Sequence, residues 1–185
     1  ADYVTVHVSS PNTPGRRALQ GRAALDDLLG RLAEARGDDP TPVFLKIAPD
    51  LTAAEIALIV EASLDHGLDA LIVSNTTLDR PDSLRSRDRA EAGGLSGAPL
   101  KARAGAALRA AAEAGAGRLP LIAAGGIDSG AEAYARIRAG ASAVQLYSAL
   151  IYEGPGLIGR IKRDLAARLR ADGFSTVAEA VSTAR

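Results

Sequence analysis

VTVHVSSPNTPG, residues 4–15, begins as a short apolar strand and stops abruptly in hydroxyls, an amide, two prolines and a glycine. Similar β-branched or leucine-rich segments recur along the chain, and they predict strands over residues 3–8, 43–48, 70–74, 119–124 and 143–147. A helical pattern follows each of them, over residues 21–36, 53–66, 100–114, 130–139 and 156–172, with a short last helix over 177–183. This alternation predicts an α/β fold with a parallel sheet covered by helices.

The strand ends are the expected location of function. The segments are continuously apolar, as in a sheet buried on both faces, and each of them ends in a polar or glycine-rich block. In barrels and other α/β folds, catalytic groups gather at the carboxyl ends of the strands. A closed (βα)8 barrel usually needs eight strands and about 250 residues. The sequence therefore predicts an incomplete barrel of about five βα units.

Composition excludes several classes of function. With 47% hydrophobic residues and 22 basic against 22 acidic side chains, the chain resembles an ordinary soluble domain with no general field for nucleic acid. The absence of cysteine excludes disulfides and thiolate chemistry, and two histidines among scattered carboxylates predict no metal site. There is no apolar stretch of membrane-spanning length. Because methionine is absent even from position 1, we expect that the chain is not a complete translated product.

Two side chains at strand ends are candidates for catalysis or ligand binding. Ser10 precedes a proline, which biases it toward an extended conformation that projects its hydroxyl, although SSPN on its own is a common turn. Lys46 lies inside an apolar strand, where a charge is costly unless it is paired, so we expect a partner. The alternative is a lysine that snorkels from the strand end.

Amides, hydroxyls and glycines are expected at the same edge. Asn12, Asn75 and Thr76 suit a ring bearing a carbonyl, an N–H and a carboxylate, although such residues also cap helices and turns. The glycine-rich turns at 93–97 and 123–130 allow the backbone to approach a ligand, or they are turn chemistry alone. The long charged stretch 77–99 is either a binding loop or a solvated connector.

These blocks together carry a resemblance. VTVHVSSPNTPG, FLKIAPDL (44–51), LIVSNTT (71–77), GGLSG (93–97), AAGGIDSG (123–130) and RAGASAVQLYSALIYEGPG (138–156) make the chain resemble quinone-dependent (class 2) dihydroorotate dehydrogenase, a flavin enzyme of de novo pyrimidine (UMP) biosynthesis. The resemblance implies that residues 1–185 are the C-terminal portion, units four to eight, of a single FMN-binding (βα)8 barrel. The N-terminal strands and membrane-associating helices would then be absent. We expect the intact enzyme to be peripheral at the inner (cytoplasmic) membrane and this fragment to be soluble.

The resemblance also implies a site. Dihydroorotate loses a proton from C5 to Ser10 and a hydride from C6 to FMN, which a quinone reoxidises; the soluble branch of the family has cysteine as the base. Barrels commonly bind phosphate after strands seven and eight, which here end at Gly125, Gly126, Tyr147 and Ser148. The cofactor-binding set is His7, Lys46, Ser74, Gly97, Gly125, Gly126, Tyr147 and Ser148, and the set for dihydroorotate or orotate is His7, Asn12, Asn75 and Thr76. His7 replaces an asparagine of the family.

Two alternatives remain. One is another phosphate- or flavin-binding barrel enzyme that shares the last two loops, and flavin absorbance separates an isomerase from the rest. The other is an inactive, truncated barrel with a binding or structural role, which the absent strands and His7 favour. Binding of the ligand without turnover would indicate the second alternative.

Overall fold

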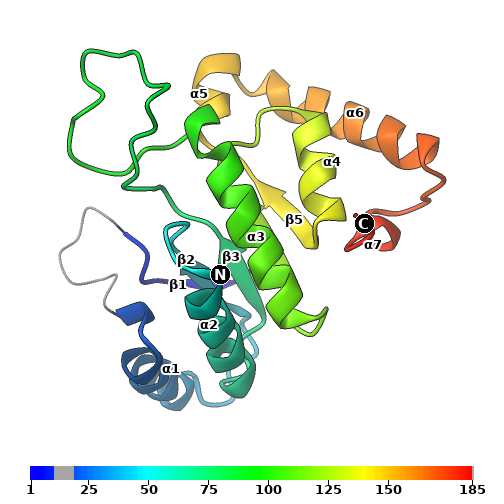
Figure 1. Ribbon diagram of the computed structural model, residues 1–185. Helices are drawn as coiled ribbons and strands as arrows, with labels where there is room; N and C mark the ends of the chain where they lie inside the picture. The colour runs from blue at the N-terminus through cyan, green and yellow to red at the C-terminus, as the bar shows by residue number, and fades with distance from the viewer. Residues whose placement is uncertain (11–18, 185) are drawn as a thin grey trace.

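The fold is built on one parallel sheet. The computed structural model describes residues 1–10 and 19–184. Strands β1 (Val4–His7), β2 (Val43–Ile47), β3 (Ala70–Val73), β4 (Leu121–Ala124) and β5 (Ala141–Gln145) are neighbours in sequence order, and every pair is parallel (Figure 1). The predicted α/β fold with a parallel sheet is therefore confirmed, as five consecutive units of a barrel-like arrangement.

Helices connect the strands and form the C-terminal part of the chain. The connections contain α1 (Arg22–Arg36), α2 (Ala53–Asp65), the short 3-10 turn η2 (Ala98–Leu100) with α3 (Lys101–Gly115), and α4 (Gly130–Arg138); α5 (Ser148–Glu153), α6 (Gly156–Ala171) and α7 (Val177–Ala180) follow β5. Helix α2 begins with a capping box, in which the Thr52 side chain accepts from the Glu55 N–H and the Glu55 side chain accepts from the Thr52 N–H. Among the described helices, none is both long and apolar enough to cross a membrane.

The core lies between the sheet and the helices. In β2, Val43, Leu45 and Ile47 are buried and pack in the main core, whereas Phe44 and Lys46 alternate with them and are half-buried on the opposite face. Only β3 has all of its residues buried. The expectation that both faces would be buried throughout is therefore met at β3 and not along β5, where Ser142 is exposed.

Several boundaries differ by a few residues from the sequence prediction, among them the start of β4 at Leu121 and the end of α7 at Ala180, and the region after β4 shows the clearest change. Strand β5 occupies residues 141–145 and not 143–147, because its ladder to β4 begins at Ala141, which pairs with Leu121. The residues that follow form α5, a helix of six residues that the sequence did not predict. The end of the sheet is therefore followed directly by a helix that begins at Ser148.

Candidate functional site

The candidate site lies at the carboxyl edge of the sheet. Within three residues of the last residue of a strand lie Ser10, Lys46, Asn75, Gly126 and Ser148. Since the strands are parallel, these positions share one edge, as the sequence predicted.

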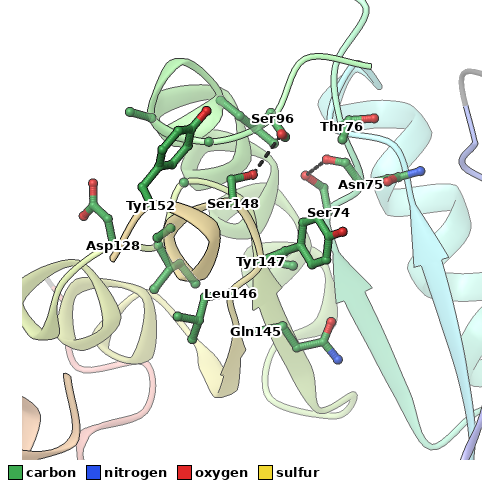
Figure 2. A pocket seen from close by; sticks show the side chains of 18 of the residues that line it. Ser74, Asn75, Thr76, Ser96, Asp128, Gln145, Leu146, Tyr147, Ser148 and Tyr152 are labelled. Atoms are coloured by element: carbon green, nitrogen blue, oxygen red, sulfur yellow. Dashed lines mark hydrogen bonds between the residues drawn. The ribbon is translucent and has the colours of Figure 1, made fainter. Parts of the chain in front are cut away.

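A cavity of about 730 Å³ opens at this edge (Figure 2). Its volume lies in the range of small-molecule and cofactor sites. Most of the predicted site residues line it: Lys46, Ser74, Asn75, Thr76, Gly97, Gly125, Gly126, Tyr147 and Ser148. His7 and Ser10 are not among its lining residues, and Asn12 lies outside the described residues.

Lys46 brings a positive charge into the cavity wall. Its Cα is in register with His7 on β1 and with Ile72 on β3, so His7 lies beside it at the same level of the sheet. Burial lowers the pKa of the Lys46 ammonium, because the charged form loses water. Burial is the one cause of this shift, and within the described residues Lys46 forms no ion pair, so the partner expected from the sequence is not supplied there. An anionic ligand group would compensate this charge.

Asn75 connects the cavity to the end of β1. Its Nδ2 donates to the carbonyl oxygen of Ser9 at 3.0 Å, and its backbone N–H donates to Ile47 O at 2.9 Å. Ser74, joined to Val73 by a cis peptide bond, donates its backbone N–H to Ala124 O at 2.9 Å. The residues after β3 are thus hydrogen-bonded to the segment after β1 and to the ends of β2 and β4. Ser10, the residue after Ser9, is held next to this junction.

The two positions after β4 require glycine. Gly126 has φ +73°, and a Cβ there would lie 2.6 Å from Lys101 Cα. Gly125 has φ +103°, and its Cβ would lie 2.8 Å from a methyl carbon of Leu100. The pair therefore packs against the first residues of α3, a helix that begins without a side-chain cap. The Lys101 N–H is bonded to Ala98 O of the preceding turn η2, whereas the Gly126 N–H has no acceptor among the described residues and is suited to an anion.

The cavity wall includes residues that sequence reasoning missed. Ser148 Oγ donates to Ser96 Oγ at 2.9 Å, which joins the start of α5 to the loop 93–97 (Figure 2). Asp128 and Gln145 also line the cavity. Ser96, Asp128 and Gln145 stand within the blocks quoted for the resemblance, so their position after a strand or beside a glycine was the available signal. Tyr147 lines the cavity at its rim, with 78% of its surface exposed.

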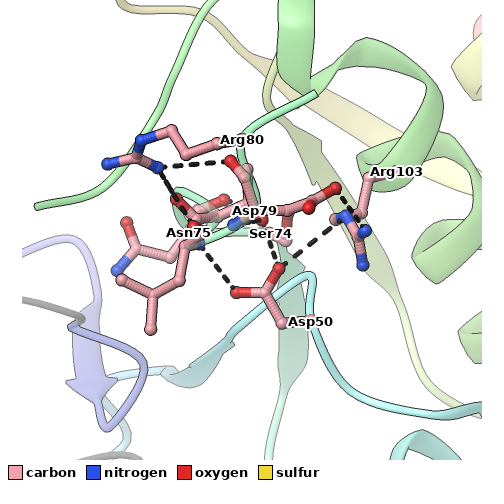
Figure 3. A network of polar contacts seen from close by, with 8 residues as sticks. Asp50, Ser74, Asn75, Asp79, Arg80 and Arg103 are labelled. Carbon is pink, nitrogen blue, oxygen red and sulfur yellow. Dashed lines mark hydrogen bonds and ion pairs between the residues drawn. The ribbon is translucent and has the colours of Figure 1, made fainter. Parts of the chain in front are cut away.

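Asp50 anchors the start of the long loop beside Asn75 and Thr76 (Figure 3). Its carboxylate accepts hydrogen bonds from Thr77 Oγ1 and from Leu78 N. Arg103 of α3 lies 3.8 Å from Asp50 and pairs with Asp79 at 2.6 Å. The polar network therefore links α3 to the segment that carries two cavity residues.

The loop is closed on itself at its base. Thr77 and Leu95 form an antiparallel bridge, and Arg80 Nη2 donates to the carbonyls of Glu91 and Gly93 at 2.8 and 2.7 Å. The part between these contacts projects away from the sheet (Figure 1). Of the two interpretations of the stretch 77–99, a free solvated connector does not describe its base, which is anchored at the cavity.

Comparisons with known proteins give matches that cover nearly the whole chain. The family described as "Dihydroorotate dehydrogenase" matches residues 1–169. Proteins named "Dihydroorotate dehydrogenase (quinone)" from Rhodospirillum rubrum and Azorhizobium caulinodans are 59% and 54% identical over 98% of this chain, which covers 50% and 52% of their lengths.

Solved structures show the same similarity. The crystal structure of a ligand-free DHODH from Eimeria tenella superposes with a TM-score of 0.93 at 41% identity, over 99% of this chain and 55% of that one. The complex of Eimeria tenella DHODH with ferulenol gives a TM-score of 0.90 at 40% identity, over 98% of this chain and 53% of that one. The chain thus spans about half the length of the relatives it matches.

Proposed function

Because the chain belongs to the dihydroorotate dehydrogenase family, we propose that the intact protein oxidises dihydroorotate to orotate in de novo pyrimidine biosynthesis and passes the electrons to a quinone. One observation carries this proposal. Most of the residues that the resemblance assigned to flavin and substrate line one cavity of about 730 Å³, and they come from four strand ends and the loop 93–97. A ligand smaller than a cofactor would not need contacts so widely spread.

FMN fits the donors that line this cavity. The Gly125–Gly126 backbone, pressed against the start of α3, leaves a cradle that side chains would fill, which suits a phosphate. Gly97, Tyr147, Ser148 and Ser74 line the same cavity. Lys46 would lie near the electron-accepting part of the flavin ring, where its cation stabilises negative charge. When bound, FMN would accept the hydride from the substrate and would then be reoxidised by the quinone.

The substrate is assigned to the β1 and β3 ends. Asn75 presents a side-chain amide and Thr76 a hydroxyl in the cavity wall, and both group types suit a ring with amide and carboxylate groups. His7 and Asn12 complete this proposed set. Ser10, placed next to the Asn75 junction, removes the C5 proton as base and passes it on through water or a neighbouring hydroxyl, because an isolated serine is a weak base. A membrane-dissolved quinone would make the intact enzyme peripheral at the inner (cytoplasmic) membrane.

The decisive experiment is anaerobic reduction of the flavin in the intact protein. Flavin absorbance should be present on purification, bleach on addition of dihydroorotate, and return on addition of a ubiquinone analogue. Absorbance without bleaching would indicate a different flavin barrel enzyme. Tight binding of orotate without reduction would indicate a binding role, which is the outcome that the replacement of asparagine by His7 favours.

A further inference from the structure

Arg136 is a buried arginine behind the glycine turn. It belongs to α4, and only 5% of its side chain is exposed. Its Nε donates to Glu132 Oε1 at 2.7 Å, one helical turn earlier. Its Nη2 reaches out of the helix and donates to the carbonyl of Lys101 at 2.6 Å, with a longer contact to the carbonyl of Gly125 at 3.5 Å. One nitrogen therefore joins the first residue of α3 to the turn after β4.

Stability alone does not explain this burial. Among the described residues, Arg136 Nη1 has no hydrogen-bond partner, and it lies 2.9 Å from where a Cβ of Gly105 would be. The absence of a side chain at Gly105 is what allows the guanidinium to lie against α3. A buried ion pair is weak support for a fold, and an unsatisfied buried nitrogen adds a cost. The contacts to two backbone carbonyls are the feature that requires an explanation.

Peptide geometry gives that explanation. In a trans peptide, the C=O of one residue and the N–H of the next point in opposite directions. If the Gly125 carbonyl is turned toward Arg136, the Gly126 N–H is turned away from it, toward the side where the cavity lies. Gly126 lines the cavity and is itself buried, and in the part of the chain that the structure describes its N–H donates to no acceptor. A buried N–H in this state is suited to a ligand oxygen.

The contact with Lys101 acts on the helix start in the same way. The Lys101 carbonyl is held by Arg136, while its ammonium pairs with Asp128 at 2.9 Å. The backbone carbonyl and the side-chain ammonium of Lys101 are thus both held, and this sets the position of the first turn of α3 against Gly126. The Lys101 N–H donates to Ala98 O of η2, so these contacts also fix the junction of η2 and α3 relative to the glycine pair.

We infer that Arg136 is a positioning residue for phosphate recognition: it holds the Gly125 carbonyl so that the Gly126 N–H faces the phosphate of the flavin nucleotide, and it holds the Lys101 carbonyl so that α3 stays packed against this turn. This inference rests on the proposed function, in which the glycine turn binds the FMN phosphate. Arg136 is not among the residues that line the cavity, so its effect is on the geometry of the backbone donors.

The test compares two flavins that differ only in the phosphate. We would measure the affinities of FMN and riboflavin by quenching of flavin fluorescence in the flavin-free intact protein, with thermal unfolding recorded for each variant. The main variant is Glu132→Gln/Arg136→Met, because removing both charges avoids leaving the half-buried Glu132 carboxylate without its closest cation. We expect FMN affinity to fall about 10- to 100-fold, as when outer partners of a binding group are removed, with riboflavin affinity unchanged. Arg136→Lys should retain part of the FMN affinity that the double variant loses, because lysine keeps the positive charge but lacks the planar guanidinium with its paired N–H donors.

A matched control is available on α6. Asp164→Asn/Arg168→Met removes an exposed ion pair with the same spacing, 3.1 Å apart, and should leave both affinities unchanged. Equal losses of FMN and riboflavin would overturn the inference, because they would show a general disturbance of α4. Unchanged FMN affinity would overturn it as well. Wild-type protein that does not prefer FMN to riboflavin would instead contradict the phosphate site of the proposed function, and the inference with it.

Discussion

Gly126→Ala tests whether the turn after β4 is built around a missing side chain. A non-glycine residue at φ +73° adopts the left-handed region, which costs about 1–2 kcal/mol. Reduced freedom of the unfolded chain returns about 0.4–1 kcal/mol, so the backbone effect alone is about 1 kcal/mol. The new Cβ would also lie 2.6–2.8 Å from Lys101 Cα, Cβ and N. Because these atoms belong to or adjoin the backbone, we add the overpacking cost of about 1–3 kcal/mol.

Gly117→Ala is the matched control. Gly117 has φ +78°, almost the same backbone conformation, and a Cβ there would meet nothing within 4 Å. Its substitution should therefore show the backbone effect alone, a loss of about 1 kcal/mol in the free energy of unfolding. Gly126→Ala should lose about 2–4 kcal/mol in total, because the overpacking cost is added.

Urea unfolding of the two variants and the wild type at one pH gives both values. A difference between the variants of less than about 0.5 kcal/mol, the usual error of additivity, would refute the reasoning. In the same samples, FMN affinity should fall for Gly126→Ala and remain unchanged for Gly117→Ala. Loss of FMN affinity in both variants would show that the effect does not come from the cavity.

Three other variants test separate parts of the site. Ser10→Ala should slow reduction of the flavin by dihydroorotate about a hundredfold or more, with FMN still bound, as stopped-flow absorbance would show. Since burial lowers the pKa of Lys46, the unfolded state binds more protons between its folded pKa and the reference value of about 10.4. Flavin-free Lys46→Met should therefore be more stable than wild type at neutral pH, and urea unfolding should show this advantage shrinking as the pH rises through that window. His7→Asn should abolish any change in orotate affinity near pH 6.5, about the reference pKa of histidine, and identical titrations would show that His7 points away from the ligand.

The sequence predicted the edge of the sheet well because the relevant signals are local. A β-branched segment and the polar block after it are adjacent in the chain, and parallel pairing then brings all such blocks to one edge. This is why Lys46, Asn75 and Gly126 could be placed together without knowing any contact between them. The short helix after β5 was missed because six residues do not display a helical period, and its N-cap residue, Tyr147, provides no side-chain cap.

Contacts between distant segments were not predictable. Glu132 and Arg136 have the spacing of an ordinary surface ion pair, and only the approach of α3 at Gly105 makes Arg136 a buried residue that contacts the backbone. Asp50 likewise follows a strand as one acidic residue among many, and its role in holding Thr77 depends on a partner 27 positions away. A single sequence contains no record of such pairs.

The first turn of α3 joins the two ends of the cavity. Lys101 lies against Gly126 and is held by Arg136, whereas Arg103 pairs with Asp79 of the loop that begins beside Asn75. Residues two apart on a helix point in different directions, so these contacts hold the same turn from two sides. A shift of α3 away from Gly126 would therefore also pull on the Asp79 segment. For this reason Gly126→Ala, though placed at the proposed phosphate end, should weaken orotate binding as well, and Gly117→Ala should not.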